Sequence, residues 1–454
     1  MHLSFIIHHF FLKTAFHLNY MKYFFIILCL VLITSNISAQ TTVDAALKAK
    51  IDADAAQVIS KVITWRRDFH QNPELSNRET RTSKIVADHL KSLGLEVRTG
   101  IAKTGVVGIL RGGKPGPTIA FRADMDALPV TERVDVPFKS VVRTTYNKVE
   151  TGVMHACGHD GHTAILMGAA EVLSKNKNDL SGTFVFIFQP AEEGSPIGEE
   201  GGAHLMIKEG VLENPKSEAI FGLHLMSNLY VGTLNYKSGG TMASSDRFEI
   251  TVTGKQSHGG NPWLGIDPIV TSAHIIVALQ TIVSRMTPLT HTPAVITVGM
   301  IQAGNRENLI PEKAKMLGTI RCLDAKVQFQ IHEQIKRIAT DIAHSQGATA
   351  DVFIETGNPV TYNDPSLVKK MLPSLAEAVP AKDLHEVEAT TIAEDFAAYQ
   401  KVIPGFFFFL GGLPLDKKVE QAPPHHTSDF FVDESGFISG VKAFCHIAVN
   451  YKTR

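Results

Sequence analysis

Cysteine is scarce in this chain. Only Cys29, Cys157, Cys322 and Cys445 occur among 454 residues. Cys29 lies in an N-terminal apolar run that we expect to be removed, and three cysteines are too few for a disulfide framework in an exported protein of this size. We therefore expect at least one free thiol, and Cys157 has the most unusual neighbours because several histidines surround it.

Net charge is almost absent. The 44 basic and 45 acidic residues give a formal charge of −1. This balance argues against a protein that binds nucleic acid or an anionic membrane. Four familiar signatures are also missing, namely GxxxxGK[ST], GxGxxG after a strand, HExxH and GxSxG. Their absence removes the usual nucleotide-binding, zincin and nucleophile-elbow interpretations.

Acidic residues are missing from the first 40 positions. The segment "MKYFFIILCLVLITSNISAQ", which starts at Met21, has a basic start, an apolar run and small residues before a break. It predicts a secretory signal cleaved after Ala39, and an uncleaved anchor helix is the alternative. We assign residues 1–40 to a leader and signal peptide. We expect the mature chain to be periplasmic or secreted, without stable membrane association.

The length of the remaining chain predicts two domains. In residues 41–237, helical patterns are followed by apolar strands that alternate with helices, which is typical of an α/β domain with a mostly parallel sheet. Residues 238–357 show a βαββαβ order, which predicts a ferredoxin-like domain inserted into the first. Residues 358–454 then complete the first domain. The "GGKPGP" that starts at Gly112 is predicted to be a turn.

The segment "MHACGHDGHTA" contains Cys157, His159 and His162 at spacings typical of metal ligands. It leads into an apolar helix, whose free amides would lower the pKa of the thiol. A metal ion requires the thiolate. A helix cap with incidental histidines and a redox-active cysteine are the alternatives.

Carboxylates and histidines follow two apolar strands. Glu192 and Glu193 come after "FVFIFQ", and two adjacent carboxylates are costly unless a cation or proton compensates their charge. A solvated acidic turn is the alternative. His224 lies in "FGLHL", where a lone histidine is more often a core residue with its hydrogen bonds satisfied. We expect these side chains at the carboxyl ends of the strands, where open α/β sheets place their sites.

Two weaker signals occur elsewhere. His425 and His426 follow a proline turn, although histidine pairs are common in loops. Asp124 and Asp126 end the apolar strand of "FRADMDALP" and can orient ligand histidines by hydrogen bonds. An ordinary turn explains the two aspartates equally well.

Taken together, these clusters point to a two-metal site. Five candidate ligands are Cys157, His159, Glu193, His224 and His426. A structural zinc site needs only four, whereas five ligands and water suit two ions that share ligands. Such a pair activates water near neutral pH. Glu192 is then positioned to act as the general base that takes a proton from this water.

Eleven segments, in order, resemble a known family: "RRDFHQNPELSNRETRTS", "FRADMDALPV", "HACGHDGHTAILMGAA", "QPAEEG", "GGAHLMIKEGVL", "FGLH", "GKQSHGG", "GIDPIV", "NLIPEKA", "GTIR" and "AEDFAAY". The resemblance spans about residues 60 to 450. It is to the amidohydrolases that include hippurate hydrolase, N-acyl-amino-acid amidohydrolases and plant auxin-conjugate hydrolases, within a wider group of co-catalytic metallopeptidases with aminoacylase.

The resemblance implies a role for each matching position. Cys157, His159, Glu193, His224 and His426 would bind two divalent ions per subunit, manganese or zinc, and Glu192 would be the catalytic base. The chain has "HTSDF" after its histidine pair, where a proline usually follows. Asp126 and Asp160 are candidates for holding the ligands in place, and His155 and His162 become supporting residues.

The inserted domain would serve as a lid and a dimer surface. His258 of "GKQSHGG" matches a lid histidine that approaches the substrate carbonyl, in its own or the partner subunit. Asn308 and Arg321 match positions that hold the substrate carboxylate, and the guanidinium fork suits that task. A plain ion pair is the alternative for Arg321. Trp263 replaces the second histidine usual in this motif.

The expected activity is hydrolysis of N-acyl amino acids, hippurate-like or acetylated, by a homodimer or other homo-oligomer. The first alternative is a carboxypeptidase or dipeptidase of the wider family, so that the substrate would be a short peptide. Two further classes are a binding protein on an inactive enzyme scaffold and a redox protein that uses Cys157. All five ligand positions and Glu192 are filled, which disfavours an inactive scaffold.

Overall fold

The computed structural model describes residues 45–290 and 292–452. The assigned leader and signal peptide, residues 1–40, lies outside the described residues. Residues 45–71 are helical, and helix α2 (Thr80–Ser92) follows. α2 buries Val86, Ala87 and Leu90 along one stripe, as an amphipathic helix on a core does.

The larger sheet has the strand order β1-β2-β6-β3-β7-β18-β8-β17. Its strands are β1 (Glu96–Ile101), β2 (Gly105–Arg111), β3 (Lys114–Asp124), β6 (Ser181–Gln189), β7 (Ala219–Tyr230), β8 (Leu234–Tyr236), β17 (Leu384–Glu386) and β18 (Gly405–Leu413). The four central strands β6, β3, β7 and β18 are parallel, and antiparallel pairs flank them. β18 is buried throughout, because helices cover both faces of a parallel sheet. The predicted mostly parallel α/β class is confirmed at the centre of this sheet.

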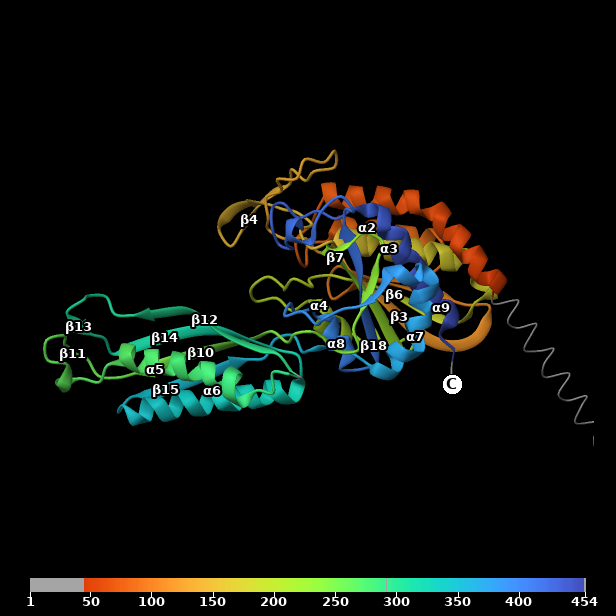
Figure 1. Ribbon diagram of the computed structural model, residues 1–454. Coiled ribbons are helices and arrows are strands. Elements are labelled where there is room, and N and C mark those ends of the chain that lie inside the picture. Colours follow the sequence, from red (N-terminus) through yellow and green to blue (C-terminus); the bar gives the residue numbers. More distant parts are fainter. Residues whose placement is uncertain (1–44, 291, 453–454) are drawn as a thin grey trace, which may run out of the picture. The chain divides into compact units, whose positions relative to one another are not determined.

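Helices cover the two faces of this sheet (Figure 1). Successive side chains of β18 point to opposite faces. Phe407 packs against Phe396 of α8 (Phe396–Gln400), with ring centroids 4.7 Å apart. Phe408 packs against Phe444 of α9 (Phe437–Asn450), at 5.8 Å. α3 (His159–Lys175) and α7 (Pro365–Ala378) contact α9, and α4 (Gly202–Lys208) contacts α8.

The "GGKPGP" segment differs from its predicted turn. β3 already begins at Lys114, which pairs with Ser181, and only Gly112 and Gly113 precede the strand. The register shifts between Lys114 and Thr118, and this irregularity accommodates the two prolines at the exposed start of the strand. A hairpin of β4 (Arg143–Tyr146) and β5 (Val149–Gly152) was not predicted.

The smaller sheet is antiparallel, in the order β12-β14-β10-β15. Its elements along the chain are β10 (Asp246–Thr253), α5 (Pro268–Thr281), β12 (Ala294–Ala303), β14 (Lys313–Cys322), α6 (Ala325–Ser345) and β15 (Thr349–Glu355). This is the predicted βαββαβ order. Asp267 caps α5 by accepting from the amides of Ile269 and Val270, and Pro268 takes the first helical position. Both helices share a core with the sheet (Figure 1).

Two short pairings complete this region. β9 (Gly239–Met242) pairs with β16 (Thr361–Asn363), so the segments that lead into and out of the smaller sheet run side by side. β11 (Ser257–His258) pairs with β13 (Leu309–Ile310). In the described residues, α5 with its π-helical extension to Met286 is long and apolar enough to cross a membrane by length and composition, and 28% of its most apolar 18-residue window is buried. Its Ile275 and Leu279 belong to the core of the smaller sheet.

Candidate metal centre

The predicted polar residues gather at the carboxyl ends of the central strands. β3 ends at Asp124 and β6 at Gln189, so Asp126 and Glu192 follow the ends of neighbouring parallel strands. β3 pairs with β7 only as far as Arg122 with Gly222. His224 lies two residues beyond that pair and therefore reaches the same edge of the sheet.

A tight turn connects Cys157 to α3. Gly158 precedes the helix with a φ of 101°, a left-handed conformation that favours glycine. A Cβ at this position would lie 3.1 Å from Cβ of Leu225, so the close approach of β7 also favours glycine. The turn places Cys157 just before the helix and His159 in its first turn.

Cys157 is the shared member of two potential metal-binding groups, one with His224 and His425 and one with Glu193 and His426. Its Sγ atom lies 3.4 Å from Nε2 of His224 and 3.4 Å from Nε2 of His426. Nε2 of His426 lies 3.0 Å from Oε1 of Glu193. The structure therefore brings these four predicted ligands together from separate segments of the chain.

His159 joins the same centre through Glu193. Its Nδ1 donates to the carbonyl of Asp126 at 2.9 Å, so Nε2 is the nitrogen available to a metal ion. Burial lowers the pKa of His159, but the charges of Asp124 and Asp126 outweigh it and raise that pKa to about 10, so a cation would have to displace a proton from Nε2. Nε2 lies 4.0 Å from Oε1 of Glu193. Within the described residues neither buried atom has a partner with hydrogen-bond geometry, although Oε1 also lies 3.0 Å from Nε2 of His426. Buried polar atoms without partners are rare. A cation between them would satisfy both, so the donor set fits a metal ion.

The hydrogen bonds also distinguish the other histidines. Nδ1 of His224 donates to the carbonyl of Leu225 at 2.7 Å, so its Nε2 faces Cys157 without a proton. His162 uses both nitrogens, Nδ1 with Asp124 at 2.7 Å and Nε2 as acceptor from the amide of Leu225 at 2.7 Å. His162 therefore has no nitrogen left for a metal.

His425 and His426 both approach Cys157, but in different states. Nε2 of His425 accepts from the amide of Ser227 at 3.3 Å, so Nδ1 carries the proton. That protonated Nδ1 faces Sγ of Cys157 at 3.7 Å. Among the described residues no backbone amide donates to Nε2 of His426, which faces Sγ of Cys157 at 3.4 Å and Oε1 of Glu193 at 3.0 Å. This difference favours His426 over His425 as a ligand.

The expected low thiol pKa is not found. Burial, followed by the charges of Glu193 and Glu192, raises the pKa of the Cys157 thiol well above its ordinary value. These effects outweigh the amides at the start of α3, since desolvation disfavours the thiolate. Cys157 and Cys322 are buried and form no disulfide within the described residues, and Cys445 is buried as well. A buried thiol with a raised pKa is poorly suited to redox chemistry on its own.

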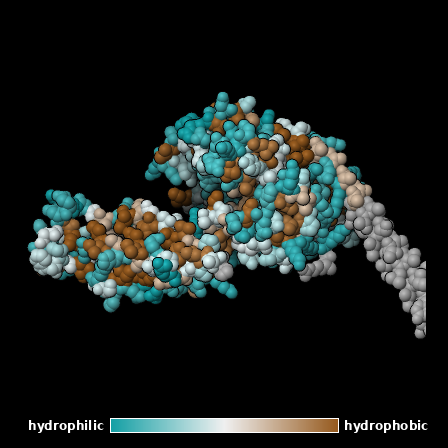
Figure 2. Space-filling view, in the orientation of Figure 1, coloured by the Kyte–Doolittle hydropathy of each residue, from teal (hydrophilic) through white to brown (hydrophobic). Residues whose placement is uncertain are grey.

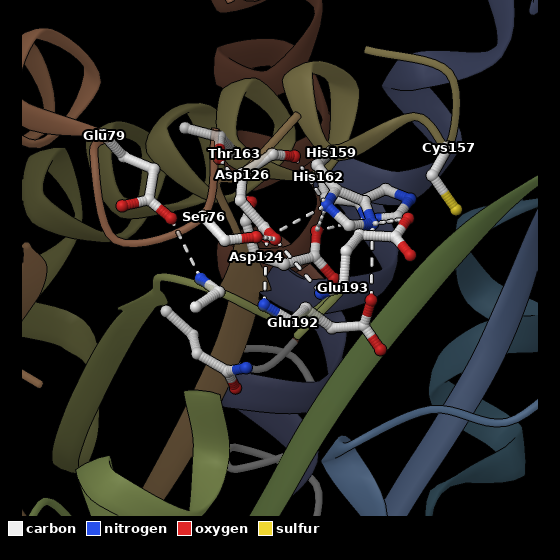
Figure 3. Close-up of polar contacts among 12 residues, drawn as sticks. Ser76, Glu79, Asp124, Asp126, Cys157, His159, His162, Thr163, Glu192 and Glu193 are labelled. Carbon is white, nitrogen blue, oxygen red and sulfur yellow. Dashed lines mark hydrogen bonds and ion pairs between the residues drawn. The ribbon is translucent and has the colours of Figure 1, made fainter. Parts of the chain in front are cut away.

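Asp126 holds the glutamate loop in place, as Figure 3 shows. Its two carboxylate oxygens accept from the amides of Glu192 and Glu193, each at 3.0 Å, and from the hydroxyl of Ser76 at 2.7 Å. Because Asp126 also accepts from His159 through its carbonyl, it links the loop to the helix that carries the histidine.

Asp160 has different neighbours. Its carboxylate lies 2.9 Å from Nε of Arg66 and 2.8 Å from Nδ1 of His70, both in the helical residues 45–71. These charges hold the pKa of Asp160 well below its ordinary value despite complete burial. Asp160 fixes the start of α3 against Arg66 and His70, and within the described part of the chain its side-chain hydrogen bonds and ion pairs involve none of the candidate ligands.

An acidic group not singled out from sequence surrounds Glu192. Glu192, Glu394 and Asp395 lie close together, and the amide of Asp395 donates to Oε1 of Glu192 at 3.3 Å. The fully buried Arg122 compensates this charge through Glu394 at 3.0 Å and Asp395 at 2.6 Å. Burial and the charge of Glu394 raise the pKa of Glu192 well above its ordinary value. In the sequence, the segment "AEDFAAY" contains Glu394 and Asp395 and was the feature from which this acidic group could have been predicted.

A cleft of about 390 Å³ opens on these residues. Its lining consists of Cys157, Glu192, Glu193, His224, Ser245, Arg321, Asn358, Thr391, Ile392, Ala393, Glu394 and His426. Arg321 of β14 is the only lysine or arginine in this lining. His258 and Asn308 do not line the cleft. Both are exposed, and the amide of Gly259 donates to the carbonyl of Asn308 at 2.8 Å.

Comparison with known proteins gives the class of this site. The profile of peptidase family M20/M25/M40 matches residues 120–450. Thermostable carboxypeptidase 2 of Saccharolobus solfataricus is 41% identical over 413 residues, 90% of this chain and 100% of that protein. N-acetylcysteine deacetylase of Bacillus subtilis is 38% identical over 391 residues, 86% of this chain and 96% of that protein.

A solved structure agrees with these matches. The crystal structure of a dinuclear metal-binding peptidase of family M20 from Bacillus subtilis is similar with a TM-score of 0.72 and 36% identity, covering 87% of this chain and 98% of that one. The site and these relatives define the protein as a metal-dependent hydrolase. The chain belongs to peptidase family M20/M25/M40.

Proposed function

We propose that this chain hydrolyses the amide bond of N-acyl amino acids and releases a carboxylic acid and an amino acid. The observation that carries the proposal is the pair of ligand groups that share Cys157. The proposed ligands of two divalent ions are Cys157, His159, Glu193, His224 and His426. The dinuclear site named for the Bacillus subtilis peptidase supports two ions here. We propose manganese or zinc as the metal.

Two bound cations would polarise the scissile carbonyl and lower the pKa of water. Glu192 is the proposed general base, which takes the proton of the attacking water and returns it to the leaving amine. Two nearby cations would favour its ionised form and so oppose the burial and the charge of Glu394 that raise its pKa. The Glu192 side chain is 9% exposed, at the border between the protein interior and the cleft. Two hydrogen bonds hold the Glu192 carboxylate toward the cleft. The amide of Asp395 donates to that carboxylate, and the backbone amide of Glu192 donates to Asp126.

The smaller sheet is proposed to act as a lid and a dimer surface. Arg321 would bind the substrate carboxylate in the cleft. Asn308 lies outside this cleft, so it would join Arg321 only after lid closure or from a second copy. His258 would donate to the oxyanion after lid closure or from a second copy. Apolar residues gather on the exposed surface of this region. They are visible in Figure 2 at the position that α5 occupies in Figure 1. Val270 and Val277 of α5 are 49% and 71% exposed, which supports a homodimer or other homo-oligomer.

A carboxypeptidase or dipeptidase is the second candidate. The 41% identity to thermostable carboxypeptidase 2 favours it, while the deacetylase relative favours the first. Both reactions break an amide next to a carboxylate, so Arg321 suits either. We also propose export to the periplasm or exterior, on the strength of the N-terminal "MKYFFIILCLVLITSNISAQ".

Kinetics with matched substrates tests the proposal. N-acetyl and N-benzoyl amino acids should be hydrolysed faster than unblocked dipeptides. Poor turnover of every acyl amino acid, together with good dipeptide cleavage, would contradict it. Glu192→Ala should keep its metal and lose activity by about 10²- to 10⁴-fold. A chelator should abolish activity, and manganese or zinc should restore it. Metal-independent, thiol-dependent turnover would instead indicate redox use of Cys157.

A further inference from the structure

A second cavity adjoins the metal centre. It has a volume of about 400 Å³. This lies within the range of roughly 300–1,000 Å³ typical of small-molecule pockets. Its lining consists of Leu75, Ser76, Arg78, Ala127, Leu128, Pro129, Thr144, Thr145, Tyr146, Asn147, Glu193, Gly194, Pro196 and Ile197. Glu193 lines both this cavity and the cleft that holds Glu192 and Arg321. Glu193, a candidate metal ligand, is therefore a wall that the two cavities have in common.

Apolar side chains form about half of the walls of this cavity, namely Leu75, Ala127, Leu128, Pro129, Tyr146, Pro196 and Ile197. Leu75 pairs with Ala127 in an isolated β-bridge, and Leu128 pairs with Met154 in another. The unpredicted β4–β5 hairpin contributes Tyr146. Ile197 is 92% exposed, although a large aliphatic side chain gains free energy from contact with an apolar group.

The cavity offers no free charge. Arg78 and Glu193 are the only charged side chains among its lining residues. Arg78 is paired with Glu199, Nη2 to Oε1 at 2.6 Å. Glu193 belongs to the metal centre. An ammonium group that entered this cavity would lose its water without finding a free carboxylate, which is unfavourable.

We propose that this cavity is the acyl subsite and that it selects a bulky, uncharged acyl group over acetyl. This inference rests on the proposed function. The carboxylate of the amino acid would then lie in the cleft with Arg321, and the scissile amide would lie beside Glu193. The absence of a free acid among the lining residues also disfavours a dipeptide with a free amino group.

Substitution of two exposed side chains tests the proposed acyl subsite without disturbing the hydrophobic core. Tyr146 is 39% exposed and Ile197 is 92% exposed, so replacing them with alanine should leave the fold intact. Leu415 is 77% exposed, lines neither cavity, and provides the matched control Leu415→Ala. The substrates are N-benzoyl and N-acetyl derivatives of one amino acid, and thermal melts of every variant verify folding.

For the native chain we expect kcat/KM for the benzoyl substrate to exceed that for the acetyl substrate by about tenfold or more. The double variant Tyr146→Ala/Ile197→Ala should lower the benzoyl value about tenfold and change the acetyl value by less than about twofold. Leu415→Ala should change neither. Inhibition by benzoate should weaken in the double variant to the same extent.

Equal benzoyl and acetyl rates would overturn the subsite, as would a double variant that lowers both rates equally or neither. Each of those results leaves the proposed function intact, because acyl amino acids are still hydrolysed. Hydrolysis of dipeptides alone would instead contradict the proposed function itself.

Discussion

Sγ of Cys157 and Nε2 of His426 lie 3.4 Å apart although 269 residues separate them in the chain. This thiol and imidazole, with the partly buried carboxylate of Glu193 beside them, supply three of the five proposed metal ligands. The chain thus reaches its last candidate ligand only after the smaller sheet has been completed. His426 itself has a φ of 62°, a rarely adopted conformation that aims its ring at the cysteine.

The metal content of purified variants tests which of His425 and His426 is a metal ligand. Cys157→Ser and His426→Ala should each lose bound metal, because each removes a proposed ligand. His425→Ala should keep the metal, since the Ser227 amide holds the proton of His425 on the nitrogen that faces the sulfur. Elemental analysis after dialysis measures this. Metal loss in His425→Ala with retention in His426→Ala would reverse the assignment.

Asp126→Asn should weaken metal binding without unfolding the chain. Asparagine has the same shape, but its NH₂ group cannot accept from the amides of the glutamate loop as the carboxylate does. Such supporting residues typically change metal affinity by about 10- to 100-fold. Titration of the metal-free protein with zinc measures the affinity. Asp135→Asn, at an exposed position, serves as the control, and equal affinities for both variants would contradict the role of Asp126.

Sequence patterns predicted the central sheet, because β3, β6, β7 and β18 are long, apolar and bounded by polar residues. They also predicted that Cys157, His224 and Glu193 lie at one edge of this sheet, because the carboxyl ends of parallel strands meet there. The β4–β5 hairpin was missed because "RTTYNKVETG" carries few apolar residues, and its strands are largely exposed. Prolines in "GGKPGP" suggested a turn, whereas pairing with β6 extends the strand.

The resemblance to the amidohydrolase family already favoured His426 over His425 as the ligand. The structure adds a physical reason, because Nε2 of His425 accepts a hydrogen bond from the amide of Ser227. The role of Arg122 could not be predicted from sequence, because a buried arginine resembles a surface residue of a strand until its partners are known. One partner of Arg122 is Asp124 on the same strand, β3. The other two, Glu394 and Asp395, lie more than about 250 residues later in the sequence.

Arg122→Met should destabilise the fold strongly. It would leave the buried carboxylates of Asp124, Glu394 and Asp395 without their cation. Such losses typically cost about 3–5 kcal/mol. Denaturant unfolding at pH 8 measures the loss. Arg111→Met removes an exposed pair with Glu96 and should cost less than about 1 kcal/mol. Similar losses in the two variants would contradict the compensation of the buried acids.

Glu79 should make stability depend on pH between about 4.5 and 7. Burial and the charge of Asp126 raise its pKa from 4.5 to about 7. Between these values the folded chain keeps a proton that the unfolded chain has lost, so this contribution to stability is complete below pH 4.5 and disappears as pH rises through 7. The change is on the order of 1–3 kcal/mol.

Glu79→Gln should remove that dependence. The glutamine carbonyl can still accept from the amides of Asn77 and Ala191, now at 3.0 and 2.9 Å, but it does not titrate. Urea unfolding at intervals from about pH 4.5 to 8 should therefore give a flatter profile for Glu79→Gln than for the native chain. Glu96→Gln, at an exposed site, should follow the native profile. If the native chain instead gained stability relative to Glu79→Gln as pH rose, the raised pKa of Glu79 would be wrong.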